Sequence, residues 1–370
     1  MFENGIRSIG AVVTLVVLPG CSAAPSSGGP GKGESIGTTE SALDATDVSF
    51  SVALRGTGTS TIHGHVYTNP TNGSGVNVLA VHGLSGTGFY FGPLAQAIFA
   101  DSGLSRAVKR IIAIDMPGHG DSTYPSNLPD GLRFGDLTID DNVSVLLQSI
   151  DALRARGLGP KVVIGHSMGG LEVQAAQQAL LSAGSSYAAH GVLGAVLLAP
   201  VPPHAQQWVR PPSGDPTPFI VNDPTLGSYL SLPPAVWIQA GTFTTLAGQI
   251  VANAPTADQV ATGRYVGPEP LTTLLQLIEA TVPLPDGGSF TLQRPTVSAG
   301  AFASSHGTPV AVVSFSQDVL VPAVNLGPLY EYLTGDTHDV LYRPVVTDDA
   351  VHGMLISNPT GMLDAIRPMF

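Results

Sequence analysis

The sequence contains a single cysteine, Cys21, and therefore cannot form a disulfide bond within the chain. Charge is also scarce, because only 11% of the residues are Asp, Glu, Lys or Arg, and 15 basic residues stand against 27 acidic ones. Proteins that bind nucleic acid present clustered lysine and arginine to the phosphates. This balance therefore argues against nucleic acid as a partner.

Glycine and proline are abundant, with 44 and 31 residues in a chain of 370, and the mean hydropathy is positive at +0.25. Such an apolar content excludes a disordered chain. The length is sufficient for one large hydrophobic core and a small accessory domain. We therefore expect a globular protein with many loops and with helices of short to moderate length.

The first 20 residues are typical of an export signal. Arg7 precedes an apolar run from Ile9 to Leu18, which is too short to span a bilayer. The run leads into Pro19, Gly20 and Cys21, and this ending resembles the lipobox of bacterial lipoproteins, in which the cysteine carries the lipid. We expect residues 1–20 to be a signal peptide and Cys21 to be a lipid anchor at the bacterial cell envelope, the only membrane contact. Simple secretion and a buried apolar N-terminus are the alternatives.

Residues 21–46 are rich in Gly, Ser, Pro and Thr, and this composition predicts a flexible tether. Residues 47–55 and 59–67 then alternate between apolar and polar side chains around a glycine turn, which predicts an antiparallel hairpin. His63 and His65 share one face of the second strand. Because no third metal ligand lies nearby in the sequence, we interpret them as solvated strand side chains and not as a metal pair.

Continuous apolar runs recur further along the chain and predict strands that are buried on both faces. Before the third of these runs, apolar residues spaced three and four apart from Ile139 to Leu153 predict a helix that packs on the sheet. This stripe is typical of a core helix and implies no cofactor. The predicted strands occupy residues 76–81, 111–114, 162–164, 192–199, 309–315 and 338–345.

The strand at 162–164 leads into Gly165-His166-Ser167-Met168-Gly169 and then into a helix-forming segment. This is the G-x-S-x-G pattern of a nucleophile elbow, a tight strand-to-helix turn that holds the serine in strained backbone and exposes its hydroxyl. Gly165 and Gly169 lack the side chains that would collide in such a turn. The pattern also occurs at 33–37, but no strand precedes that match and no helix follows it. Ser167 is therefore the candidate nucleophile.

Three motifs follow predicted strands in a fixed order: HG at 82–83, D-x-P-G-H-G-x-S at 115–122 and G-H-S-M-G at 165–169. In this order they resemble the α/β-hydrolase superfamily, in its lipase/esterase-like branch, from about residue 47 to the C-terminus. The resemblance implies an α/β fold with a mostly parallel sheet, helices on both faces and a helical cap insertion. It assigns 47–200 and 306–370 to the core and 201–305 to the cap, where we expect amphipathic helices near 235–251 and 271–280.

The resemblance also implies a catalytic triad in the chain order Ser, Asp, His. Ser167 would be the nucleophile, Asp318 would follow the strand at 309–315, and His352 would be the base near the C-terminus. The backbone N–H groups of Leu84 and Met168 would form the oxyanion hole.

Other residues are rivals for these roles. Asp348 and Asp349 could replace Asp318 as the acid, but their closeness to His352 in the sequence favours positions in a surface loop. His119 lies in a loop that is structural in the superfamily, so we do not expect it to be the base.

A serine triad implies acyl transfer, which requires no metal or organic cofactor. Ester hydrolysis is the first prediction, because the cap segment carries few charges and suits an apolar small-molecule ester. An aminopeptidase or amidase is the closest alternative, and a non-catalytic binding protein at the cell envelope belongs to another class. Carboxylates that could hold the ammonium group of an aminopeptidase substrate are Asp223, Asp258, Glu269 and Glu279, and apolar side chains of the cap are Trp208, Phe219, Tyr229, Trp237, Phe243 and Leu274.

Overall fold

A computed structural model of the chain describes residues 45–71, 73–209, 220–222, 235–238, 267–283, 288–336 and 341–370. The predicted signal peptide, Cys21 and nearly all of the tether lie outside the described residues, as does much of the predicted cap. Asp223, Asp258, Phe219, Tyr229 and Phe243 also lie outside them. Within the described part of the chain, no helix is both long and apolar enough to cross a membrane.

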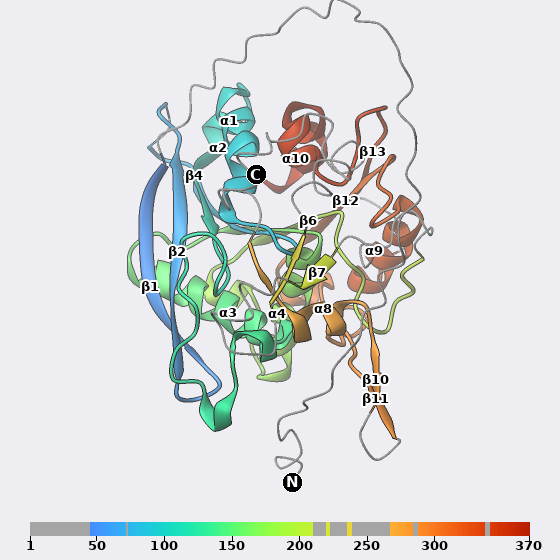
Figure 1. Ribbon diagram of the computed structural model, residues 1–370. Helices are drawn as coiled ribbons and strands as arrows, with labels where there is room; N and C mark the ends of the chain where they lie inside the picture. The colour runs from blue at the N-terminus through green and yellow to red at the C-terminus, as the bar shows by residue number, and fades with distance from the viewer. Residues whose placement is uncertain are drawn as a thin grey trace, which may run out of the picture. The chain divides into compact units, whose positions relative to one another are not determined.

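The described residues form a mostly parallel sheet of eight strands (Figure 1). In spatial order these are β1 (Ala45–Leu54), β2 (Gly58–Thr68), β4 (Val108–Ile114), β3 (Val76–Val81), β5 (Val162–His166), β6 (Gly194–Leu198), β12 (Val310–Phe315) and β13 (Tyr342–Val345). β1 and β2 form the predicted antiparallel hairpin, and β2 also runs antiparallel to β4. The predicted α/β architecture is confirmed.

The parallel strands bring two predicted loops together. β5, β6 and β12 are buried along their whole length, as continuous apolar runs between two layers of helices require. β3 and β5 pair in parallel with Val81 opposite Gly165, so both strands end at the same edge of the sheet. The segment after Val81 therefore lies beside the segment after Gly165.

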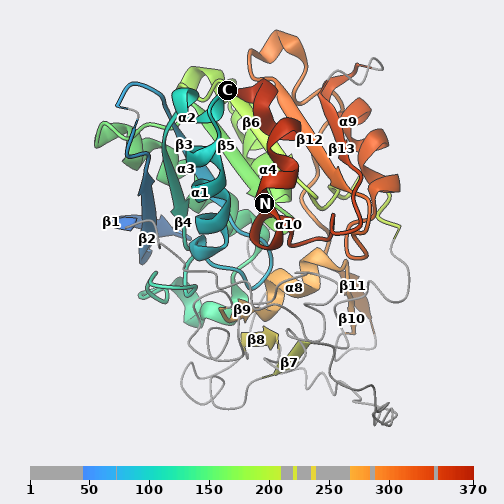
Figure 2. The same ribbon diagram turned by 90° about the horizontal axis from the view of Figure 1, so that it is seen from above.

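Helices cover both faces of this sheet (Figure 2). α1 (Gly92–Ala100) packs with α10 (Met354–Ser357) on one face, and α3 (Ile139–Ala155) packs with α4 (Met168–Ser182) on the other. α3 begins where the apolar stripe predicts, because Thr138 and Asp141 form a capping box with a 2.8 Å bond from the Thr138 N–H to the Asp141 carboxylate. Further helices are α2 (Leu104–Ala107), α9 (Leu326–Thr334) and α11 (Leu363–Ile366).

Between β6 and β12 the described residues include a small antiparallel sheet of β7 (Ile220–Asn222), β8 (Ala235–Ile238) and β9 (Glu269–Pro270), followed by the helix α8 (Leu271–Leu277). The helix predicted near 271–280 is confirmed, but residues 235–238 form a strand where we expected a helix. The sequence Ala-Val-Trp-Ile explains the error, since β-branched and aromatic residues favour strands.

Helix α8 is attached to the start of α3. Its Thr273 hydroxyl donates a 2.9 Å hydrogen bond to the carbonyl of Leu137, and the Ile139 N–H donates to the Gln276 side chain at 2.8 Å. Both α8 residues are buried. These bonds hold α8 against the core of the protein.

A separate compact unit contains the hairpin of β10 (Thr281–Pro283) and β11 (Ser289–Thr291). The two strands are antiparallel, with Thr281 opposite Thr291, and the hydroxyl oxygens of these two residues lie 2.9 Å apart.

Candidate active site

Ser167 occupies the turn between β5 and α4 in a strained backbone conformation, with φ 54° and ψ −118°. A positive φ is costly for a residue with a side chain and persists only where the surrounding structure enforces it. The turn is enforced by close packing. A Cβ added at Gly165 would collide with the backbone of Gly169, and a Cβ added at Gly169 would collide with the carbonyl oxygens of Val81 and His82. The predicted elbow geometry is therefore present.

The loop after β3 lies against this elbow. A Cβ added at Gly83 would lie 2.8 Å from the Cβ of Ser167, so only glycine fits there without displacement. Leu84 follows in this loop, and Met168 is the first residue of α4. Neither amide nitrogen donates a hydrogen bond to another group in the part of the chain that the structure describes. Both N–H groups are thus free to bind a substrate oxygen.

Asp318 and His352 form a buried pair. The Nδ1–H of His352 donates to Oδ2 of Asp318 at 2.8 Å, and the two residues are 4% and 5% exposed respectively. The other carboxylate oxygen, Oδ1, accepts 2.8 Å bonds from the N–H groups of Leu320 and Val321, which fix the orientation of the carboxylate. The rival Asp349 is engaged elsewhere, since it accepts hydrogen bonds from Thr347 and Asn358.

His166 connects the His352 loop to the elbow. Its Nε2–H donates a 2.9 Å hydrogen bond to the carbonyl of His352, and the two rings lie 4.7 Å apart. Burial, together with the neighbouring His352, holds the pKa of His166 well below its usual value, so the ring is neutral and carries its proton on Nε2. This residue was not among those predicted to act at the site. Its place immediately before Ser167 was the available signal.

Two further histidines stabilise the loops around the site. His82 donates from Nδ1 to the Gly83 carbonyl at 2.8 Å and accepts at Nε2 from the Met116 N–H at 3.1 Å. Burial, with a smaller effect from His119, lowers the pKa of His82 to about 3, which leaves it neutral in this role. His119 is 1% exposed and bonds to the Pro117 carbonyl. The burial of His119 and its hydrogen bond to Pro117 agree with the prediction that this loop is structural.

Glu269 is a buried carboxylate at the same loop. Its Oε2 accepts a 2.6 Å bond from the N–H of Ser85 and lies 3.3 Å from Nε2 of His119, while Ser85 accepts a 2.7 Å bond from the Gly267 N–H. Burial lowers the pKa of His119, but the negative charge of Glu269 and the hydrogen bond between the two side chains raise it by more than burial lowers it. The net shift of the His119 pKa is therefore upward. We predicted Glu269 only as a possible site for an ammonium group. The structure instead uses it to hold the segment next to Leu84.

Apolar side chains from α8 lie beside the candidate oxyanion loop. Leu274 is 4% exposed and packs against Leu84, Leu271 and Ile278. Because Leu84 is only partly buried, this cluster places apolar surface next to one of the two free N–H groups. The carboxylate of Glu279, in contrast, is paired with His204 at 2.7 Å and with Arg294 at 3.5 Å.

The prediction that His63 and His65 are solvated was wrong. His65 is 2% exposed and His63 is partly buried, and both approach carboxylates of the loop that follows β4. The prediction considered only neighbours in the sequence. The pairing of β2 with β4 brings Asp115 and Asp121, which are distant in the sequence, close to His63 and His65.

Comparison with known proteins agrees with this fold. Residues 78–359, more than half of the chain, match the model of the alpha/beta hydrolase family. An esterase from Rhodococcus sp. ECU1013 is 18% identical, with 88% of this chain and 97% of that chain covered and a TM-score of 0.51. A putative lipase from Acinetobacter baumannii AYE is 15% identical, with 87% and 90% covered and a TM-score of 0.51. No curated protein matches. The chain therefore belongs to the alpha/beta hydrolase family.

Proposed function

We propose that this hydrolase cleaves carboxylic esters of apolar small molecules through an acyl-enzyme intermediate on Ser167. The observation that carries the proposal is the 2.8 Å bond between Asp318 and His352, in a loop that His166 fastens beside the strained Ser167 elbow. An imidazole that donates from Nδ1 to a carboxylate keeps its lone pair on Nε2. That nitrogen can accept the proton of a serine hydroxyl.

The reaction then proceeds in two stages. Oγ of Ser167 attacks the ester carbonyl carbon while its proton passes to Nε2 of His352, and the C–O bond to the alcohol breaks as that alcohol takes the proton. A water molecule, deprotonated by the same nitrogen, attacks the acyl-enzyme and releases the carboxylic acid. Asp318 holds the tautomer and stabilises the imidazolium that forms in each stage.

The N–H groups of Leu84 and Met168 supply the oxyanion hole of this proposal. Neither N–H has a hydrogen-bond partner among the residues that the structure describes, and the contact of Gly83 with Ser167 puts their two loops side by side. Loss of one such donor typically raises the barrier by about 3 kcal/mol. Because Glu269 holds the N–H of Ser85, it supports the position of Leu84 without contacting the reacting atoms.

Ester cleavage is preferred to aminopeptidase activity because of the state of Glu269 and Glu279, the two candidate carboxylates that the structure describes. An ammonium group needs a carboxylate that is available to it, yet Glu269 is fully buried with its Oε2 bonded to Ser85, and Glu279 is paired with His204 and Arg294. The apolar cluster of Leu84, Leu271, Leu274 and Ile278 suits an uncharged acyl or alcohol group. We further propose that residues 201–305 form the cap insertion of this hydrolase.

The first test compares wild type with Ser167→Ala on short-chain p-nitrophenyl esters and on aminoacyl p-nitroanilides. We expect ester turnover by the wild type to fall by about 10⁴-fold or more in Ser167→Ala, because the nucleophile is lost. Ser182→Ala, an exposed serine on the same helix, is the matched control and should keep full activity. A fluorophosphonate probe should label the wild type and the control but not Ser167→Ala.

Other outcomes would point to the alternatives. Preferential turnover of the anilides would favour the aminopeptidase. If neither substrate reacts and the probe leaves Ser167 unlabelled in folded protein, the triad proposal fails and a non-catalytic binding protein becomes the better explanation.

A further inference from the structure

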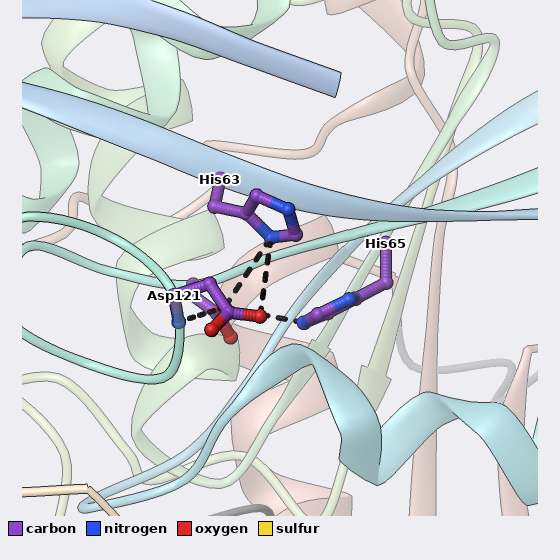
Figure 3. A group of neighbouring side chains, drawn as sticks. His63, His65 and Asp121 are labelled. Atoms are coloured by element: carbon purple, nitrogen blue, oxygen red, sulfur yellow. Dashed lines mark hydrogen bonds and ion pairs between the residues drawn. The ribbon is translucent and has the colours of Figure 1, made fainter. Parts of the chain in front are cut away.

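Four potential metal ligands converge between β2 and the loop that follows β4. His63 and His65 are two residues apart on β2 and therefore point to the same face of the sheet. Asp115 and Asp121 belong to the loop after β4. Figure 3 shows the two imidazole rings turned toward the carboxylate oxygens beside Asp121. The four donor atoms all lie within 4.8 Å of one another.

The distances suit a small tetrahedral ion. Nε2 of His65 lies 3.2 Å from Oδ2 of Asp115, and Nδ1 of His63 lies 3.8 Å from the same oxygen and 3.9 Å from Oδ2 of Asp121. Tetrahedral Zn²⁺ with bonds near 2.0–2.1 Å separates its ligand atoms by roughly 3.3 Å. Contraction of the two longer contacts by about half an ångström would bring them to this spacing.

One atom in the cluster lacks a hydrogen bond. Nδ1 of His63 is buried and has no hydrogen-bond partner among the described residues, because both neighbouring carboxylate oxygens are too far away. Buried polar nitrogen atoms are nearly always satisfied in native proteins. An ion placed between this nitrogen and the two carboxylates would supply the missing interaction.

The surrounding contacts hold the ligands in place. Asp115 accepts a 2.6 Å bond from the Gly88 N–H at Oδ1 and a 2.9 Å bond from the Asp121 N–H at Oδ2. Nε2 of His63, the ring nitrogen that faces away from the cluster, lies 3.4 Å from Oδ1 of Asp47. Carboxylates that bond to the second nitrogen of a metal-binding histidine are typical of zinc sites, because they orient the ring.

From this geometry we infer that the protein binds one Zn²⁺ ion through His63, His65, Asp115 and Asp121. Two neutral imidazoles and two carboxylates supply two negative charges, which the divalent ion balances, and two nitrogen with two oxygen donors suit tetrahedral Zn²⁺. The ion takes the place of the proton between Nε2 of His65 and Oδ2 of Asp115, and the neutral His65 then carries its proton on Nδ1. It joins β2 to the loop after β4 and takes no part in the chemistry at Ser167.

The test uses full-length protein without a polyhistidine tag, freed of metal by a chelator and titrated with Zn²⁺ against a chromophoric competitor. Wild type should bind one equivalent, with an upward shift of the thermal midpoint. His63→Gln and Asp121→Asn should each weaken binding by at least about tenfold and reduce that shift, because each removes one ligand. Asp121 is 63% exposed at its side chain, so its substitution leaves the fold intact.

Matched controls separate this inference from the proposed hydrolysis. His190→Gln alters a partly buried histidine that pairs with Asp151 at 3.1 Å, away from the cluster, and should bind Zn²⁺ as the wild type does. Ser167→Ala should also bind normally, whatever its activity. If wild type takes up no stoichiometric Zn²⁺, or if His63→Gln and Asp121→Asn bind as tightly as wild type, the assignment is wrong.

Discussion

At the scale of single residues, Glu172 is a carboxylic acid buried in α4 shortly after Ser167. Its Oε1 accepts a 2.8 Å bond from the Asn142 side chain, and its Oε2 has no partner among the described residues. Burial raises the pKa of Glu172 well above its usual value, and the charge of Glu269 raises it further, although the Asn142 bond opposes the shift. The folded protein therefore keeps this group protonated where the unfolded chain would ionise it.

This shift predicts a pH-dependent stability. Above about pH 4.5, the usual value for Glu, the unfolded chain releases a proton that the folded protein retains, so the free energy of unfolding falls as pH rises toward the raised pKa. Glu172→Gln removes this dependence, which can reach about 1.4 kcal/mol per pH unit. Urea unfolding from pH 4 to pH 9 should give a flatter curve for Glu172→Gln.

The control for this comparison is Glu331→Gln, an exposed position on α9. Its stability should follow the wild-type curve across the whole pH range. Equal slopes for wild type and Glu172→Gln would contradict the neutral, buried state of Glu172.

At the scale of secondary-structure elements, the β5–α4 turn was predictable because part of its constraint is local, namely the close approach of Gly165 to Gly169. Two glycines spaced around a serine between an apolar strand and a helix describe one backbone geometry, and the structure has it. The small sheet of β7, β8 and β9 was not predictable in the same way. A short apolar segment such as residues 235–238 fits either a strand or a helix, and its partners β7 and β9 settle the choice.

The turn predicts a large effect of one methyl group. Gly169→Ala would place its Cβ against the carbonyl oxygens of Val81 and His82, which belong to a buried strand end and cannot move easily. We expect a loss of about 1–3 kcal/mol in the free energy of unfolding, as for other overpacked sites. Thermal and denaturant unfolding measure it.

Gly73→Ala serves as the comparison, since a Cβ at Gly73 meets no atom within 4 Å. Its stability should stay within about 0.5 kcal/mol of wild type. A Gly169→Ala protein as stable as Gly73→Ala would show that the turn is looser than this packing indicates.

At the scale of the whole molecule, we propose that the N-terminal segment carries the hydrolase to the bacterial cell envelope. The support is the sequence alone: an apolar run after Arg7, then the only cysteine of the chain at Cys21 and a segment with little apolar content up to residue 46. A single lipid chain gives only marginal binding to a membrane, so stable anchoring at Cys21 needs more than one acyl chain.

The anchor is tested by metabolic labelling with a palmitate analogue in a bacterial host. Wild type should incorporate the label and sediment with membranes, whereas Cys21→Ala should remain unlabelled because it lacks the acceptor thiol. Ser22→Ala, the neighbouring substitution, should be labelled as the wild type is. Label retained by Cys21→Ala would end the lipoprotein proposal and leave simple secretion.

By itself, the sequence determined what depends on neighbouring residues. Apolar runs specified the central strands, spacing of three and four specified α3, and the glycines of G-H-S-M-G specified the turn at Ser167, since each follows from local sterics or periodicity. The order Ser167, Asp318, His352 was also readable, but only as an order along the chain.

The tertiary structure decided which distant groups meet. The parallel pairing of β3 with β5 puts Gly83 against Ser167, and the pairing of β2 with β4 surrounds His63 and His65 with carboxylates. The hydrogen bond from the Ser85 N–H to Glu269 likewise joins residues that are far apart in the sequence. These contacts could not be predicted from spacing, because they join residues far apart in sequence and arise only once the strand order and the burial of each side chain are established.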